Sequence, residues 1–175
     1  MYAHGQGALV LCEAFMLTGD DKLRAPAQKA IDFIVKAQHG QGGWRYRPGD
    51  TGDTSVLGWQ VMALQSARMA EFDVPTSTIE DAQLYLDQVE RLGGAKYAYD
   101  KQRGWSHAMT AEGLLCRMYL GWTLDTKRGK LIEGGKWLLE DSPPRFGIGK
   151  NPENLYYIYY ATQALHHIGG ETWSK

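Results

Sequence analysis

Apolar residues recur along the chain at the three- and four-residue spacing of α-helices, in stretches separated by glycine, proline or aspartate. Patterns that alternate with a period of two are absent over any length that a β-sheet needs. The pattern therefore predicts an all-α fold. The expected helices cover residues 4–17, 24–38, 53–71, 78–90, 107–122, 127–140 and 152–168.

The odd-numbered helices resemble one another, which indicates an internal repeat. Gly7, Gly58 and Gly113 open matching apolar segments that lie 51 and 55 residues apart (58 − 7 and 113 − 58). A period of about fifty residues with two helices per unit is typical of an array of helical hairpins. The odd-numbered helices are apolar nearly all round, so we expect them to be inner helices. The even-numbered helices carry charges on one face and are expected to form an outer layer.

The composition of the 175 residues fits one globular helical-repeat domain over residues 1–175. Its 19 basic and 20 acidic residues are scattered, which argues against a nucleic-acid or membrane-surface patch. No apolar stretch is long enough to span a membrane. Cys12 and Cys116 lie among apolar residues and are expected to be buried thiols. Because the chain starts directly in a helical pattern, we expect it to be part of a longer protein.

The most specific stretch is the end of the second predicted helix and the turn after it. Residues 29–38 (KAIDFIVKAQ) are followed by the residues HGQGGW, which end at Trp44. Gln38 can hydrogen-bond backbone groups left open at the helix end, and the Trp44 indole can fill the seam between repeats. These residues match the QW motif of triterpene cyclases. Weaker copies lie at residues 82–97 and 134–138.

On these motifs the chain resembles the squalene-cyclase and prenyltransferase α/α toroids over nearly its whole length. The resemblance implies inner and outer helices around a central cavity. The seven predicted helices make about three and a half hairpins, and the resemblance implies about twice as many in a closed toroid, so we expect a partial ring.

The segment after Trp44 is where the resemblance places the chemistry of squalene-hopene cyclases. Their acid motif, Asp-x-Asp-Asp-Thr-Ala, matches at Asp50, Asp53 and Thr54. Gly52 stands where the family has the aspartate that donates the proton, and a glycine cannot donate one. The usual acid motif is therefore incomplete.

Other toroid families resemble the chain at the same place. The zinc site of protein prenyltransferases matches at Asp53, but Ser55 and Tyr157 stand at the other two ligand positions, and neither is a normal zinc ligand. The Cys-Gly-Glu-Gln thioester of the complement group is absent. Pectate lyases on a related toroid need a calcium site and a positioned arginine, and no motif here singles one out. We therefore expect no metal and no cofactor.

Asp50 and Asp53 are the candidate catalytic residues, because they lie at a predicted helix start where the helix dipole favours carboxylates. Helix capping is the structural alternative for both. The candidate ligand-binding residues could line an aromatic pocket that stabilises a carbocation or stacks on a sugar, with ordinary core packing as the alternative. They are Trp44, Tyr46, Trp59, Trp105, His107, Tyr156 and Tyr157.

Two functions from different classes follow. The first is a squalene-cyclase-like repeat domain without the usual acid and zinc motifs, acting as a ligand-binding or scaffolding module. The alternative is an active terpenoid cyclase or glycan-active lyase that uses Asp53 in the toroid cavity. In either case we expect a hydrophobic or glycan small molecule as ligand. A homodimer through the open repeat ends is a further possibility.

Overall fold

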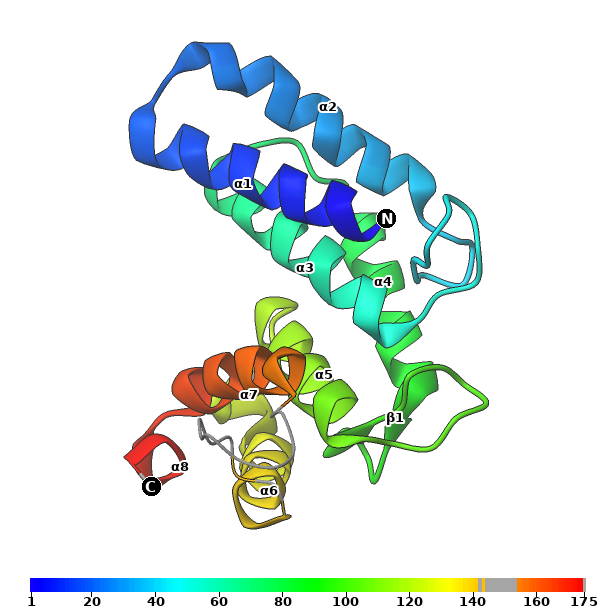
Figure 1. Ribbon diagram of the computed structural model, residues 1–175, viewed down its shortest axis with the longest axis vertical. Coiled ribbons are helices and arrows are strands. Elements are labelled where there is room, and N and C mark those ends of the chain that lie inside the picture. The colour runs from blue at the N-terminus through cyan, green and yellow to red at the C-terminus, as the bar shows by residue number, and fades with distance from the viewer. Residues whose placement is uncertain (142, 144–153, 175) are drawn as a thin grey trace. The chain divides into compact units, whose positions relative to one another are not determined.

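The computed structural model describes residues 1–141, 143 and 154–174, shown in Figure 1. The chain divides into two compact units, Met1–Tyr85 and Leu86–Lys175, here called the N-terminal and the C-terminal unit. The described residues are predominantly helical, so the predicted all-α fold is confirmed. The expectation of a single domain and that of a partial ring stay predictions, as does that of a homodimer.

The N-terminal unit is a three-helix packing with the start of a fourth helix. Its helices are α1 (Tyr2–Thr18), α2 (Asp21–Ala37), α3 (Thr54–Met69) and the first part of α4 (Thr76–Val89). Helix α1 packs along both α2 and α3, as Figure 1 shows. The largest fully buried side chains of this unit are Ile31, Ile34, Trp44, Leu57, Leu64 and Tyr85.

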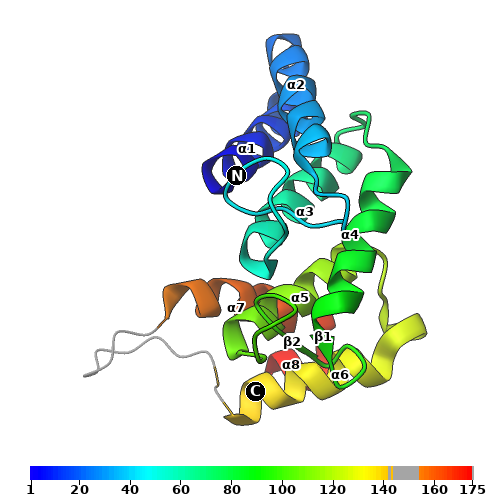
Figure 2. The ribbon, with the colours of Figure 1, turned by 90° about the vertical axis from the view of Figure 1, so that its right-hand side faces the viewer.

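The C-terminal unit is built around α5, which packs against α6, α7 and strand β2 (Figure 2). The strands β1 and β2 form a short antiparallel hairpin in which Glu90 pairs with Tyr97. The elements of this unit are β1 (Glu90–Arg91), β2 (Lys96–Tyr97), α5 (His107–Tyr119), α6 (Leu124–Asp141), α7 (Leu155–Ile168) and α8 (Gly170–Ser174).

The inner and outer character of the helices follows the sequence pattern, with α1 as an exception. Helices α3 and α5 are buried nearly all round, whereas α2 buries one stripe of its surface. Helix α1 was expected to be an inner helix, yet Val10 and Leu17 are 62% and 86% exposed. No described helix has both the length and the apolar character needed to cross a membrane.

The predicted helix boundaries differ from the described ones by a few residues. The helix predicted to run to residue 122 ends at Tyr119, because Gly121 takes a positive φ of 111° that closes the helix. The expected start of the last long helix, Pro152, lies outside the described residues. Each strand has two residues and α8 has five, too few to give a periodic pattern. The sequence pattern therefore missed the hairpin and α8.

Candidate functional site

The turn between α2 and α3 is closed by neutral hydrogen bonds. The Gln38 side-chain amide donates to the carbonyl oxygens of Gly42 at 2.9 Å and Thr78 at 3.0 Å. The Trp44 indole N–H donates to the Ile34 carbonyl at 2.8 Å, and the side chain is fully buried. Trp44 thus holds the turn against α2. The ring has no exposed surface here, and its contact with a ligand stays a prediction.

Asp53 lies immediately after this turn and is the N-cap of α3. Its Oδ1 accepts hydrogen bonds from the Val56 backbone N–H at 2.9 Å and from the Ser55 hydroxyl at 2.7 Å. The Tyr2 hydroxyl in turn donates to Ser55 Oγ at 2.6 Å. These bonds form a continuous chain of hydroxyl groups from the half-buried Tyr2 phenol to the fully buried Asp53 carboxylate.

The second oxygen of Asp53 faces an arginine. Arg45 Nε lies 3.6 Å from Asp53 Oδ2, and the Arg45 side chain is 30% exposed. Oδ2 is buried and makes no hydrogen bond within the described structure. Next to Arg45, the ring of Tyr46 is exposed and stacks on that of Tyr2, with the ring centroids 5.9 Å apart. The residues Tyr2, Arg45, Tyr46, Asp53 and Ser55 are called the Asp53 cluster below.

This arrangement suits a ligand that carries a carboxylate. A partly exposed guanidinium backed by a buried carboxylate is a preorganised cation, and arginine binds carboxylates through two parallel hydrogen bonds. Asp53 itself is fully buried, so it acts on a ligand only through Arg45 and Ser55. The exposed Tyr46 ring, stacked on Tyr2, adds an aromatic face to the cluster.

The other acidic candidate, Asp50, is half-buried in the turn, where its backbone N–H donates to the Arg47 carbonyl at 3.3 Å. Gly52, which replaces the expected acid, is fixed by packing. A Cβ at Gly52 would lie 2.7 Å from both the Gly43 Cα and the Tyr85 ring. The Tyr85 ring occupies the space that an acidic side chain would need, so no side chain fits at this position.

A metal site is not formed by these residues. Among the described residues, no group of three or more histidine, cysteine, aspartate or glutamate side chains could hold a metal ion. Asp53 Oδ1 already accepts two hydrogen bonds, and Oδ2 faces Arg45. No step of the chemistry below passes through a metal.

The remaining candidates lie elsewhere in the two units. Trp59 is a half-buried residue of α3. Tyr156 donates to Glu112 Oε2 at 2.7 Å, and the nearly buried Tyr157 donates to the Leu138 carbonyl at 3.5 Å, so both hydroxyls have protein partners.

Trp105 and His107 lie in the C-terminal unit together with two residues that the sequence analysis did not single out. Trp105 contacts both Trp137 and His107, and Lys96 contacts both indole rings. In the N-terminal unit, sequence reasoning also missed Arg45 and Tyr2. For Arg45, a basic residue eight positions before the helix-capping aspartate was the available signal, whereas Tyr2, 51 positions before it, offered none (53 − 45 and 53 − 2).

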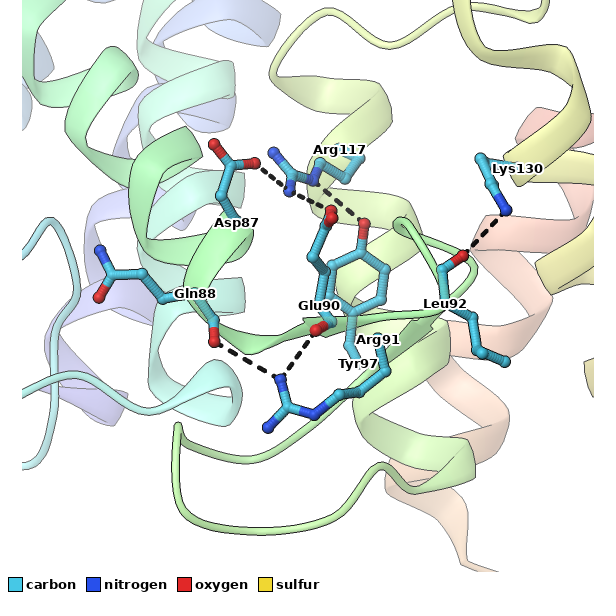
Figure 3. Close-up of polar contacts among 8 residues, drawn as sticks. All are labelled: Asp87, Gln88, Glu90, Arg91, Leu92, Tyr97, Arg117 and Lys130. Carbon is cyan, nitrogen blue, oxygen red and sulfur yellow. Dashed lines mark hydrogen bonds and ion pairs between the residues drawn. The ribbon is translucent and has the colours of Figure 1, made fainter.

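A buried arginine network in the C-terminal unit was not predicted either, and Figure 3 shows it. Arg117 Nε donates to the Tyr97 hydroxyl at 3.1 Å, and its Nη2 donates to Asp87 at 2.5 Å and Glu90 at 3.0 Å. Burial by itself lowers the pKa of Arg117, but the interactions with Tyr97 and Asp87 outweigh it and raise the pKa. The guanidinium is 3% exposed and saturated with partners, so its role is structural.

Comparison with known proteins changes the expected family. The family model of pectic acid lyases matches residues 5–61, about a third of the chain. This segment is similar to pectic acid lyases. No curated protein and no solved structure gives a significant match.

The matched segment contains both the Gln38–Trp44 turn and Asp53. The predicted squalene-cyclase and prenyltransferase family is therefore wrong, and so are the QW-repeat and terpenoid-cyclase descriptions and the non-catalytic cyclase-like module. The physical reason is that the Gln38 and Trp44 hydrogen bonds close a helical hairpin. Such a closure specifies a local turn geometry and carries no information about the chemistry of the neighbouring site.

Proposed function

We propose that the chain is a lyase domain that acts on an acidic polysaccharide of the pectic-acid type. The observation that carries the proposal is the similarity of residues 5–61 to pectic acid lyases. That segment includes Arg45, Tyr46, Asp53 and Ser55 of the Asp53 cluster, and Tyr2 lies just before it. The alternative of a glycan-active lyase that depends on Asp53 is thus retained and made more specific.

Cleavage of a polyuronate by β-elimination makes defined demands on a site. A base takes the proton from C5, next to the sugar carboxylate, and the C5–H electron pair forms a C4=C5 double bond. The C4–O bond breaks with its electron pair on the departing oxygen, which then takes a proton. The C5 proton is hard to remove while the neighbouring carboxylate keeps its full negative charge, so a cation must face that carboxylate.

Arg45 is the cation that we assign to the uronate carboxylate. Its side chain is 30% exposed, and the buried Asp53 carboxylate lies 3.6 Å from its Nε. The planar guanidinium matches the geometry of a carboxylate, so its exposed part can bind the uronate through parallel hydrogen bonds. Asp53 is thus a positioning residue, which holds Arg45 before the substrate arrives.

Tyr2 is the group that we assign to proton transfer. Through Ser55, its proton can pass along hydrogen bonds of 2.6 and 2.7 Å toward Asp53. The phenolate then takes the C5 proton and returns it to the departing oxygen. The relay runs back afterwards, so the C5 proton ends on the leaving group and the protein is unchanged. The Tyr46 ring, stacked on Tyr2, offers a face for the sugar.

The test is a cleavage assay with the full chain and polygalacturonate, in which the 4,5-unsaturated uronate product is followed by its ultraviolet absorbance. The native protein is expected to form this product. Arg45→Met and Tyr2→Phe are each expected to lower kcat/KM about 100-fold or more. Arg68→Met, at the exposed far end of α3, is the matched control and leaves the rate unchanged. Absence of product from the native protein, or an unchanged rate in Arg45→Met, would overturn the proposal.

A further inference from the structure

A second cluster of aromatic and charged side chains lies wholly within the C-terminal unit. Lys96 Nζ lies 3.9 Å from the ring centroid of Trp105 and 3.9 Å from that of Trp137. The two indoles meet edge to face, with their centroids 4.7 Å apart at 88°. Together with His107 and Asp141, these residues are called the Trp105 cluster below. None of them lies within residues 5–61, the segment similar to pectic acid lyases.

The Trp105 cluster is held rigidly from two sides. His107 stacks on Trp137 with the rings 7° from parallel and the centroids 4.4 Å apart, and its Nε2 lies 2.9 Å from Asp141 Oδ2. Trp105 is held by its backbone, which forms an isolated bridge with Ala98. The Trp105 ring nevertheless stays 44% exposed. A fixed, half-exposed indole is what a sugar ring requires for stacking, because no side-chain freedom is lost on binding.

Lys96 has unused hydrogen-bonding capacity. An ammonium group carries three N–H donors, and the face of an indole attracts its charge but offers no lone pair. Within the described part of the chain, no carboxylate or carbonyl accepts a hydrogen bond from Lys96, although Asp141 lies in the same cluster. A half-buried cation of this kind favours an anionic acceptor that comes from outside the protein.

We propose that the Trp105 cluster is a binding subsite for an acidic pyranose, in which Trp105 stacks on the sugar ring and Lys96 binds its carboxylate. The choice of a uronate as the acidic sugar rests on the proposed function, whereas the site itself rests on the geometry of Lys96, Trp105 and Trp137. A neutral sugar would use only the indole. The subsite would hold a polyuronate chain at a place separate in sequence from the Asp53 cluster.

The test is calorimetric titration of the full chain with trigalacturonate, carried out in the Arg45→Met background to remove binding at the Asp53 cluster. Trp105→Ala and Lys96→Met are each expected to weaken binding about tenfold or more. Trp173→Ala is the matched control for the indole, because Trp173 is 49% exposed in the same unit. Lys101→Met, an exposed lysine of the neighbouring loop, is the control for charge. Both controls keep the parent affinity.

Galactotriose, the neutral counterpart of the probe, is expected to bind about tenfold more weakly, and Lys96→Met is expected to leave its affinity unchanged. Unchanged affinity of Trp105→Ala and Lys96→Met for trigalacturonate overturns the proposal, as does equal binding of the two trisaccharides. The Trp105 side chain is half exposed, so Trp105→Ala keeps the fold, which circular dichroism checks. If Arg45→Met does not fold, the same substitutions are compared in the Tyr2→Phe background, where cleavage of the probe is slowed and the loss of affinity is measured against that parent.

The two proposals fail in different ways. Lys96-dependent binding of trigalacturonate without any cleavage by the native protein rejects the lyase function and keeps the subsite. Cleavage that depends on Arg45, with no loss of binding in Lys96→Met, rejects the subsite and keeps the lyase function.

Discussion

The two units close equivalent turns with different chemistry. In the N-terminal unit, Gln38 and Trp44 close the turn with neutral hydrogen bonds to backbone carbonyls. In the C-terminal unit, Glu90 and Tyr97 stand at the corresponding positions, 52 and 53 residues further on (90 − 38 and 97 − 44). There the closure is charged, because Arg117 binds both Glu90 and the Tyr97 hydroxyl, as Figure 3 shows.

This difference decides which charges remain available for function. A neutral closure leaves Arg45, which follows Trp44 directly, paired with the buried Asp53 and still 30% exposed. The charged closure leaves its arginine inaccessible to a ligand, since Arg117 is 3% exposed and bound to three side chains. The first turn therefore keeps a partly exposed arginine, whereas the arginine at the second turn is buried and structural.

The largest expected effect on stability is at Arg117. Arg117→Met leaves Asp87, Glu90 and the Tyr97 hydroxyl without their shared donor, as Figure 3 makes visible. Breaking a buried ion pair costs about 3–5 kcal/mol, and because Asp87 is 57% exposed we expect the low end. Urea denaturation measures the loss. Arg103→Met, whose pair with Asp100 is exposed, serves as control and changes the free energy of unfolding by less than about 0.5 kcal/mol.

At each turn a glycine packs closely against an aromatic ring: Gly52 of the first turn against Tyr85, and Gly113 of α5 against Tyr97 of the second turn. A Cβ at Gly52 would lie 2.7 Å from the Tyr85 ring, and one at Gly113 would collide with the Tyr97 ring. Gly52→Ala and Gly113→Ala are each expected to destabilise the protein by about 2 kcal/mol through overpacking. Thermal melts test this. Gly7→Ala is the matched helical control, since its Cβ would meet nothing within 4 Å, and it should stabilise slightly.

A smaller effect is expected for the neutral closure itself. Trp44→Phe keeps most of the buried ring but leaves the Ile34 carbonyl without the indole donor, which costs about 1–2 kcal/mol. Denaturation at low and high salt should give the same loss, because no charge is involved. A strong salt dependence of the loss in Trp44→Phe would break the distinction between a neutral and a charged turn.

The smallest expected effect is on the reactivity of the two cysteine thiols, one of which lies in each unit. Burial, with a smaller contribution from Glu13, raises the pKa of Cys12 from 9.0 to about 11, and burial with Glu112 raises that of Cys116 well above 9.0. Because the thiols are held protonated in the folded state, their contribution to stability is present below pH 9. It declines as the pH rises from about 9 toward 11 for Cys12. Neither thiol should react with a disulfide reagent at pH 8 in the folded protein.

In Arg117→Met, titrated with urea, Cys116 is expected to become reactive at a lower concentration than Cys12. Mass spectrometry of the labelled peptides distinguishes the two sites. Simultaneous labelling would show that the two units lose structure together and that the effect of Arg117 is not confined to its own unit.

Local signals in the sequence predicted the helices and the first turn. Asp53 begins α3 as a capping residue, and Gln38 and Trp44 make the hydrogen bonds that their positions imply. The pairing of Arg117 with Asp87 and Glu90 could not be predicted, because it joins residues 30 and 27 positions apart across separate elements.

The candidate site was only partly predictable for the same reason. The sequence shows that a glycine, Gly52, stands where the acid was expected. Only the structure shows that the Tyr85 ring fills the space that an acidic side chain would need there. Lys96 and Trp137 carry no local signal, since their contact depends on packing between the hairpin and α6. The expected family was wrong because the turn motif describes a hairpin closure.

We propose that the first turn carries the chemistry and that the second turn carries stability. Asp53→Asn tests it most directly, because asparagine caps a helix as well as aspartate but gives Arg45 no counter-charge and cannot take the proton of the Tyr2 relay. We predict that kcat/KM on polygalacturonate falls about 100-fold, while the free energy of unfolding changes by less than about 1 kcal/mol. Full activity in Asp53→Asn, with only stability changed, would show that Asp53 is a helix cap and would contradict the account.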